Sequence, residues 1–208
     1  MKITLAGSRH FGVETFNMMR GHGIEVIRVV VADADDRLAA AARAVGIEVV
    51  VQAKPKVIVA SEIAPGTDLI VTAHSHALVS EGALKAAKHG GIGYHPSLLP
   101  RHRGIAAVEW TIKEGDAIAG GTIYHLSERL DAGAIAAQDW VFVKKNETAR
   151  ELWERALAPL GLRLLAQVID QAKTSGHLPS MPQDEQFATN APRLDKDIPH
   201  AAPKSAAS

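Results

Sequence analysis

Apolar runs and amphipathic segments alternate along the first half of the chain. The apolar runs, rich in Val, Ile and Leu, occupy residues 2–7, 24–33, 47–52, 68–74 and 91–95. Runs of this length, bounded by glycine or polar residues, are typical of buried strands. Segments with helical features separate several of them, at residues 11–21, 35–46 and 80–90. The alternation predicts an α/β fold with a mostly parallel, twisted sheet flanked by helices.

The second half of the chain follows a different pattern. Two β-rich segments, at residues 119–126 and 134–143, predict an antiparallel hairpin at the edge of the sheet. Residues 147–176 predict one long amphipathic helix that begins with a Thr148–Glu151 capping box. Pro159 lies inside this helix and is expected to kink it.

The composition becomes small and polar close to Gln183. Segments of this kind bury too little apolar surface to offset the entropy of ordering them. We therefore expect one domain over residues 1–182, followed by a polar, mobile C-terminal tail over residues 183–208.

Charge and composition narrow the class of protein. Among 208 residues, 23 Lys and Arg balance 23 Asp and Glu, which argues against a nucleic-acid partner. Cysteine is absent, so disulfides, thiolate metal sites and cysteine nucleophiles are excluded. The sequence has neither a stretch of about 18 apolar residues nor the pattern of a signal peptide. We expect a cytoplasmic protein with no membrane partner.

His74 and His95 lie at the carboxyl ends of two predicted strands, where the ligands of parallel sheets gather. His74 and His76 have a spacing that suits two zinc ligands, but neither an HExxH motif nor an acidic partner lies nearby. We therefore favour a polar strand end over a metal site. Pro96 restricts the backbone of His95 to an extended conformation, and Gly93 permits close backbone approach. His95 is as compatible with catalysis as with a structural role on these features alone.

Other candidate motifs are weaker. Asp131, in the loop between the two hairpin segments, has the commoner interpretation of a turn aspartate before Gly133. The stretch GSRHFG after the first strand lacks the glycines of a dinucleotide-binding fingerprint. The basic turn from Arg101 to Arg103 is compatible with an anion-binding site or with a solvated loop.

The motif YHPSLLPRHRG, with LDAG further along the chain, resembles the folate-dependent formyltransferase family. This family includes glycinamide ribonucleotide and methionyl-tRNA formyltransferases and the hydrolase domain of 10-formyltetrahydrofolate dehydrogenase. The resemblance runs from Met1 to about Asp195. It implies a Rossmann-like domain, 10-formyltetrahydrofolate as the donor and no metal.

The resemblance also implies roles for individual residues. The motif histidine and aspartate, which are catalytic in the family, correspond to His95 and Asp131. The strand-end loop Ser75, His76, Ala77 and Leu78, and the loop containing Leu126, Glu128 and Leu130, correspond to those that grip the pterin. Gly93, two residues before the motif histidine, is counted among the same folate-binding residues. Ser97, Arg101 and Arg103 are our candidates for binding the acceptor, because the basic turn can hold an anionic group.

Three departures from the family pattern bear on the acceptor. Gly93 stands where most members carry asparagine. The hydrolase domain of the dehydrogenase, whose motif is the most similar, also lacks this asparagine. GSRHFG is not the glycine-rich phosphate loop of a glycinamide ribonucleotide enzyme. Residues 182–192 resemble the linker of a methionyl-tRNA enzyme, but a second, tRNA-gripping domain is not part of this sequence.

These features lead to one leading hypothesis and two alternatives. The leading hypothesis is a formyltransferase or formyl hydrolase that moves the formyl group to a small amine or to water through a tetrahedral intermediate. His95 would donate a hydrogen bond to the oxyanion, while Asp131 orients His95 or holds a proton-transferring water. One alternative is a catalytically weak folate-binding module. The other is a metallohydrolase that uses His74, His76 and His95. The acceptor is not identified, and the sequence is compatible with a homodimer.

Overall fold

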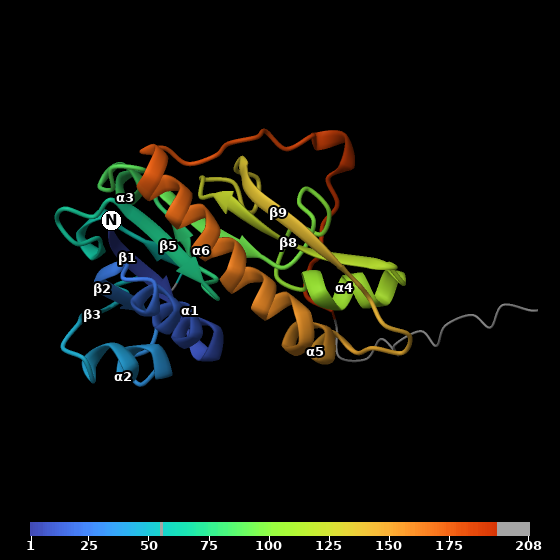
Figure 1. The fold of residues 1–208 in the computed structure, drawn as a ribbon, viewed down its shortest axis with the longest axis horizontal. Helices are drawn as coiled ribbons and strands as arrows, with labels where there is room; N and C mark the ends of the chain where they lie inside the picture. The colour runs from blue at the N-terminus through green and yellow to red at the C-terminus, as the bar shows by residue number, and fades with distance from the viewer. Residues whose placement is uncertain (55, 195–208) are drawn as a thin grey trace, which may run out of the picture.

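The structure, a computed structural model, describes residues 1–54 and 56–194. A seven-stranded sheet with the order β3-β2-β1-β5-β7-β8-β9 forms its centre (Figure 1). The strands are β1 Lys2–Gly7, β2 Glu25–Val31, β3 Glu48–Val51, β5 Leu69–Ala73, β7 Gly91–His95, β8 Ile118–His125 and β9 Ile135–Phe142. The pairs from β3 to β7 are parallel, and β8 and β9 pair antiparallel at the edge. The mostly parallel sheet with an antiparallel edge hairpin is confirmed.

Helices and short elements connect these strands. The α-helices are α1 Arg9–Gly21, α2 Arg37–Arg43, α3 Glu81–Lys85, α4 Ala107–Glu114, α5 Ala149–Leu152 and α6 Ala158–Ser175. Two-residue strands β4, Val57–Ile58, and β6, Leu78–Val79, form a separate parallel pair. Within the described residues, none of the helices is both long and apolar enough to cross a membrane.

The two faces of the sheet are covered unequally. On one face, α1 and α6 pack over the central strands, and their apolar residues join the larger core cluster (Figure 1). A smaller cluster, which includes Ile58, Ile70 and Ala83, covers part of the opposite face. On that second face, β7 carries Gly93 and His95, because residues two apart in a strand point to the same side. The candidate site lies at the carboxyl ends of β5 and β7, and residues from both faces contribute to its wall.

Local sequence signals account for several element ends. The side chains of Asp36 and Ser80 accept hydrogen bonds from the backbone N–H groups of Leu38 and Ala83, and so cap α2 and α3. Gly176 ends α6 in a left-handed conformation with φ of 78°, which glycine adopts without a steric penalty.

The long C-terminal helix is interrupted. The Thr148–Glu151 capping box is present, with the Thr148 N–H 2.9 Å from a carboxylate oxygen of Glu151. A π-helical turn, Trp153–Leu157, then separates α5 from α6. Pro159, which has no backbone N–H to donate, follows in the first turn of α6. The sequence therefore predicted the position of the irregularity, although not its form as a π-turn.

Two sequence expectations about helices need correction. The helix expected over residues 80–90 is shorter, since α3 spans only Glu81–Lys85. Helix α4 was not expected at all. Its buried residues Val108 and Thr111, followed by Gly115 in a left-handed conformation, are a helix signal that the neighbouring motif overshadowed.

Candidate active site

A cleft of about 520 Å³ opens at the carboxyl ends of β5 and β7. Phe11, Tyr94 and Trp153 form an aromatic part of its wall, with ring centroids of Phe11 and Trp153 5.2 Å apart. His95 and Asp131 lie in the same wall. A mostly apolar cleft with a few converging polar groups, of this volume, is the usual form of a small-molecule site.

His95 is nearly buried, with 6% of its surface exposed. Its Nε2 atom lies 2.8 Å from the backbone carbonyl oxygen of His102. A carbonyl oxygen can only accept a hydrogen bond, so Nε2 must carry the hydrogen. The other ring nitrogen, Nδ1, lies 3.5 Å from Oδ2 of Asp131.

Asp131 is held by three other segments of the chain. Its Oδ1 accepts a hydrogen bond from the Tyr124 hydroxyl at 2.8 Å, and its Oδ2 accepts one from the Gly104 N–H at 2.9 Å. Gln183 donates to its backbone carbonyl at 2.9 Å. Asp131 itself has a left-handed backbone with φ of 49°, a conformation that aspartate tolerates better than most residues. The carboxylate is therefore fixed at one position in the wall of the cleft.

Tyr124 keeps its proton at this site. Burial, and secondarily the charge of Asp131 and the hydrogen bond to it, raise the pKa of the Tyr124 hydroxyl well above its ordinary value. The phenol is consequently a permanent donor to Asp131 at neutral pH.

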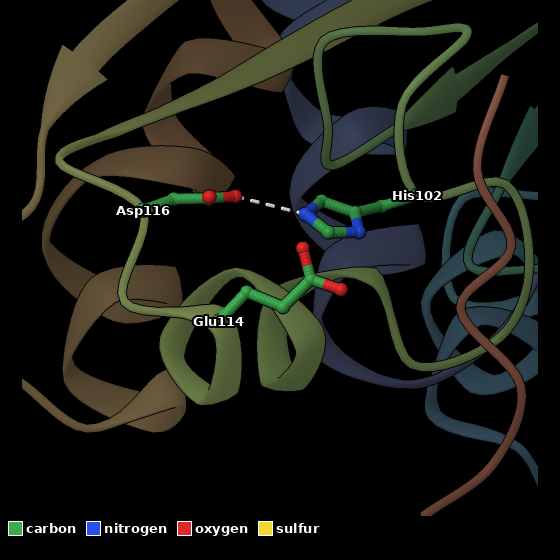
Figure 2. A group of neighbouring side chains, drawn as sticks. All are labelled: His102, Glu114 and Asp116. Atoms are coloured by element: carbon green, nitrogen blue, oxygen red, sulfur yellow. Dashed lines mark hydrogen bonds and ion pairs between the residues drawn. The ribbon is translucent and has the colours of Figure 1, made fainter. Parts of the chain in front are cut away.

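His74 and His76 lie side by side at the end of β5, with ring centroids 5.3 Å apart. Burial and the neighbouring His76 lower the pKa of His74, which favours its neutral form. Over residues 1–54 and 56–194, one group of histidine and carboxylate side chains is close enough to share a metal ion, and it consists of His102, Glu114 and Asp116 (Figure 2). The metallohydrolase alternative therefore gains no support, since its three histidines are not in that group.

An arginine side chain already pairs with the two carboxylates of that group. The Arg101 guanidinium lies 2.5 Å from a Glu114 oxygen and 2.7 Å from an Asp116 oxygen. Burial acts to raise the pKa of Asp116, but hydrogen bonds from Arg101 and His102 outweigh it and hold that pKa below its ordinary value. Arg101 thus balances the negative charge that a metal ion would need.

The residues expected to bind the pterin divide into two sets. Ser75, His76 and Leu130 line the cleft. The others lie outside its walls: Ala77 packs against the smaller core cluster, Leu78 lies in β6, Leu126 packs beside Gly91, and Glu128 is exposed.

Gly93 lies behind the cleft wall rather than in it. A Cβ atom at this position would lie 2.6 Å from Oγ1 of Thr72 and 3.3 Å from the Tyr124 ring. Both neighbours line the cleft. In this chain, Thr72 thus fills the space that a larger side chain at position 93 would need.

The three residues expected to bind the acceptor are engaged in internal contacts outside the cleft. The Ser97 hydroxyl donates to the Arg101 carbonyl at 2.6 Å. Arg101 pairs with Glu114 and Asp116, as described above. Arg103 is buried and donates to Gln183 and Glu185. This arrangement gives no support to their assignment as acceptor-binding residues.

The segment that follows α6 contacts the site loop. Gln183 binds the backbone of Asp131 and Gly133, and the Thr189 hydroxyl accepts from the His102 N–H at 2.8 Å. The expected mobility from residue 183 therefore does not fit residues 183–192, which pack against the domain. Residues 195–208 of the expected tail lie outside the described residues.

Sequence reasoning missed the partners of the two candidate catalytic residues. His102, Gly104 and Tyr124 carried no signal of their own, because backbone groups and a strand tyrosine are invisible to motif analysis. The fold and the cleft together define a Rossmann-like α/β protein with a cleft at the carboxyl ends of its strands.

Comparison with known proteins identifies the family. A family model described as formyl transferase matches residues 2–169. The chain is 35% identical over 201 residues to mouse cytosolic 10-formyltetrahydrofolate dehydrogenase, covering 91% of this chain and 22% of that protein. This chain therefore belongs to the formyl transferase family. It spans only about a fifth of the length of that relative.

Solved structures agree on the fold. Phosphoribosylglycinamide formyltransferase from Anaplasma phagocytophilum superposes with a TM-score of 0.72 and 26% identity, covering 90% of this chain and 98% of that one. An N-formyltransferase from Helicobacter canadensis, in complex with folinic acid and dTDP-3-aminofucose, gives a TM-score of 0.72 at 17% identity. It covers 93% of this chain and 71% of its own. The Rossmann-like fold class is confirmed.

Proposed function

We propose that this chain moves the formyl group of 10-formyltetrahydrofolate to water or to a small amine, with His95 and Asp131 as the catalytic pair. The observation that carries the proposal is the 3.5 Å separation of His95 Nδ1 and Asp131 Oδ2 in the wall of the cleft. Membership of the formyl transferase family supports formyl transfer as the reaction class.

A folate donor suits both the relatives and the cleft. One relative is named for 10-formyltetrahydrofolate, and one solved neighbour holds folinic acid. The aromatic wall of Phe11, Tyr94 and Trp153 offers flat apolar surface for a ring system, and Ser75 and His76 offer polar edges. The cleft volume lies in the range of sites for ligands of drug size.

The hydrogen bonds around His95 define what its ring can do. Nε2 already donates to His102, so the ring exchanges protons with the cleft only through Nδ1. When Nδ1 is protonated, the imidazolium faces the Asp131 carboxylate, an arrangement that opposite charges favour. We assign this Nδ1–H as the donor to the formyl oxygen when that oxygen becomes negative, the type of interaction that stabilises a developing oxyanion.

The transfer conserves atoms and protons as follows. The oxygen of water, or the nitrogen of an amine, bonds to the formyl carbon, and the bond from that carbon to N10 breaks. One proton leaves the nucleophile and one reaches N10, which releases tetrahydrofolate with formate or a formamide. Asp131 is the group that holds the proton-transferring water or the imidazolium in place.

Two measurements test the proposal. Purified protein is mixed with 10-formyltetrahydrofolate and a panel of amines, and formylated products are detected by mass spectrometry while release in water alone is recorded. His95→Ala and Asp131→Asn are expected to lose turnover, and wild-type rates in both variants would refute the assignment. Binding of a folate analogue without turnover on any acceptor would identify a folate-binding module instead.

A further inference from the structure

The carbonyl that fixes the tautomer of His95 belongs to an unusually constrained residue. His102 has a left-handed backbone with φ of 58°, a conformation that costs a residue with a Cβ roughly 1–2 kcal/mol. Only 2% of its surface is exposed. Something in the surrounding structure must hold this conformation, because isolated residues of this type leave it readily.

Two contacts hold His102, one on each side. Its side-chain Nε2 lies 2.9 Å from Oδ2 of Asp116, in the segment between α4 and β8 (Figure 2). Its backbone N–H donates to the Thr189 hydroxyl at 2.8 Å. The ring is therefore tied to one part of the chain and the backbone to another. The carbonyl between them is aimed at His95.

Asp116 is itself prepared for this contact. Arg101 donates to it at 2.7 Å and 3.2 Å, so its carboxylate stays charged and oriented while it accepts from His102. Glu114 pairs with Arg101 as well, but its side-chain hydrogen bond runs to Arg101 and not to His102. Asp116 and Glu114 therefore differ in one respect that an experiment can use: Asp116 alone of the two bonds to the His102 ring.

The same loop serves both members of the candidate pair. His102 gives its carbonyl to His95, and two residues later Gly104 gives its N–H to Asp131. A shift of the loop would move both contacts together. Displacements of about 1 Å in reacting groups can cost roughly 100-fold in rate.

We propose that the His102–Asp116 pair positions His95 by holding the His102 carbonyl against Nε2, which leaves Nδ1 as the nitrogen that faces the cleft. His102 and Asp116 are positioning residues in this account, and they do not touch the reacting molecules. The inference rests on the proposed function for its catalytic consequence, but its structural core, the tautomer of His95, can be measured without any substrate.

Four variants separate the positioning contact from its surroundings. His102→Phe keeps a ring but removes the donor, and Asp116→Ala removes the acceptor. Asp116→Asn is the conservative rescue, because its amide oxygen can still accept from the His102 ring. Glu114→Ala is the matched control, since it removes the other carboxylate on Arg101 and leaves the contact with His102 in place.

The first readout is the tautomer of His95 in protein labelled with ¹⁵N-histidine, followed by long-range ¹H–¹⁵N correlation spectra and assigned with His95→Gln. The Nε2–H form is expected in the wild type, Asp116→Asn and Glu114→Ala. A mixture of the two tautomers is expected in His102→Phe and Asp116→Ala. Melting temperatures establish that each variant is folded, and two independent disrupting variants keep the test valid if one fails to fold.

The second readout is kinetic. Turnover of 10-formyltetrahydrofolate by His102→Phe and Asp116→Ala is expected to fall about 10- to 100-fold in kcat, with KM unchanged. Persistence of the pure Nε2–H form in both disrupting variants would overturn the proposal, and so would a lost tautomer with wild-type kcat. A wild type without turnover would refute the proposed function alone, because the spectra would still decide whether His102 and Asp116 set the tautomer.

Discussion

Replacing Asp131 by asparagine removes one charge from the site while keeping its shape. The variant amide can place its oxygen toward the Gly104 N–H and its nitrogen toward Tyr124, whose hydroxyl can rotate to accept. Both contacts survive, so we expect the folded structure to tolerate the change. What disappears is the negative charge 3.5 Å from Nδ1 of His95.

The geometry gives the size of the effect. Two unit charges at that separation interact by roughly 5 kcal/mol at an effective dielectric constant of about 20. Desolvation and relaxation consume part of this energy, and each 1.36 kcal/mol that is lost from transition-state stabilisation costs about tenfold in rate. The charge is therefore worth at most about 3.5 orders of magnitude, which agrees with the roughly 10²–10⁴-fold contribution of positioned acid–base groups.

The assay is the release of tetrahydrofolate from 10-formyltetrahydrofolate under saturating donor. We expect kcat of Asp131→Asn to fall about 100- to 1,000-fold, with little change in KM, because the carboxylate acts on the transition state. Asp139→Asn is the matched control, since Asp139 pairs with Arg163 on the surface of β9, away from the cleft. Equal kcat in Asp131→Asn and wild type would refute the role of the carboxylate, and an equal loss in Asp139→Asn would show that the effect is not local.

Three further substitutions test the architecture around the site. Gly93→Asn should destabilise the fold by roughly 1–3 kcal/mol in urea denaturation, because its Cβ would lie 2.6 Å from Thr72 Oγ1. Adding Thr72→Ala should recover part of this loss, and unchanged stability in the single variant would contradict the packing. Gly161→Ala should lower the melting temperature, because its Cβ would lie 2.5 Å from the Tyr94 ring in the cleft wall; a neutral result would mean that Tyr94 has room to move. Burial acts to raise the pKa of Asp116, yet hydrogen bonds hold it below the ordinary value, so its contribution to stability is complete above about pH 4 and is lost as the pH falls through the lowered pKa. Unfolding free energies of wild type and Asp116→Asn should therefore converge in acid, and a pH-independent difference would argue against this linkage.

The sequence was sufficient to predict the frame of the site but not its closure. Strand runs placed His74 and His95 at the carboxyl ends of β5 and β7, where the structure has them. The loop aspartate was found through the family motif rather than through its pattern, since a turn aspartate is the commoner case. Strand patterns depend on residues that are close together in the chain, so they can be recognised from the sequence alone.

The basic turn shows why the remainder was out of reach. Arg101 and Arg103 were interpreted as anion-binding residues, yet their partners are Asp116, Gln183 and Glu185, as many as 82 residues away along the chain. When the partner of a charged loop residue comes from a distant segment, the sequence near that residue gives no sign of the pairing, and the charge is interpreted as unpaired. The contrast between a solvated cation and a buried one lies in tertiary contacts, which no local pattern encodes.

The site is consequently built more from backbone geometry than from side-chain identity. The His102 carbonyl orients His95. The N–H of Gly104, two positions further along the same loop, orients Asp131. Gln183 donates a hydrogen bond to the Asp131 carbonyl and accepts one from Arg103. The segment after α6 therefore connects the loop of residues 101–104 to Asp131. Because both members of the pair depend on one short loop, changes that leave their side chains untouched can still separate them. The catalytic role proposed for the pair therefore depends on how residues 101–104 are held, and sequence identity at the pair alone does not guarantee the geometry.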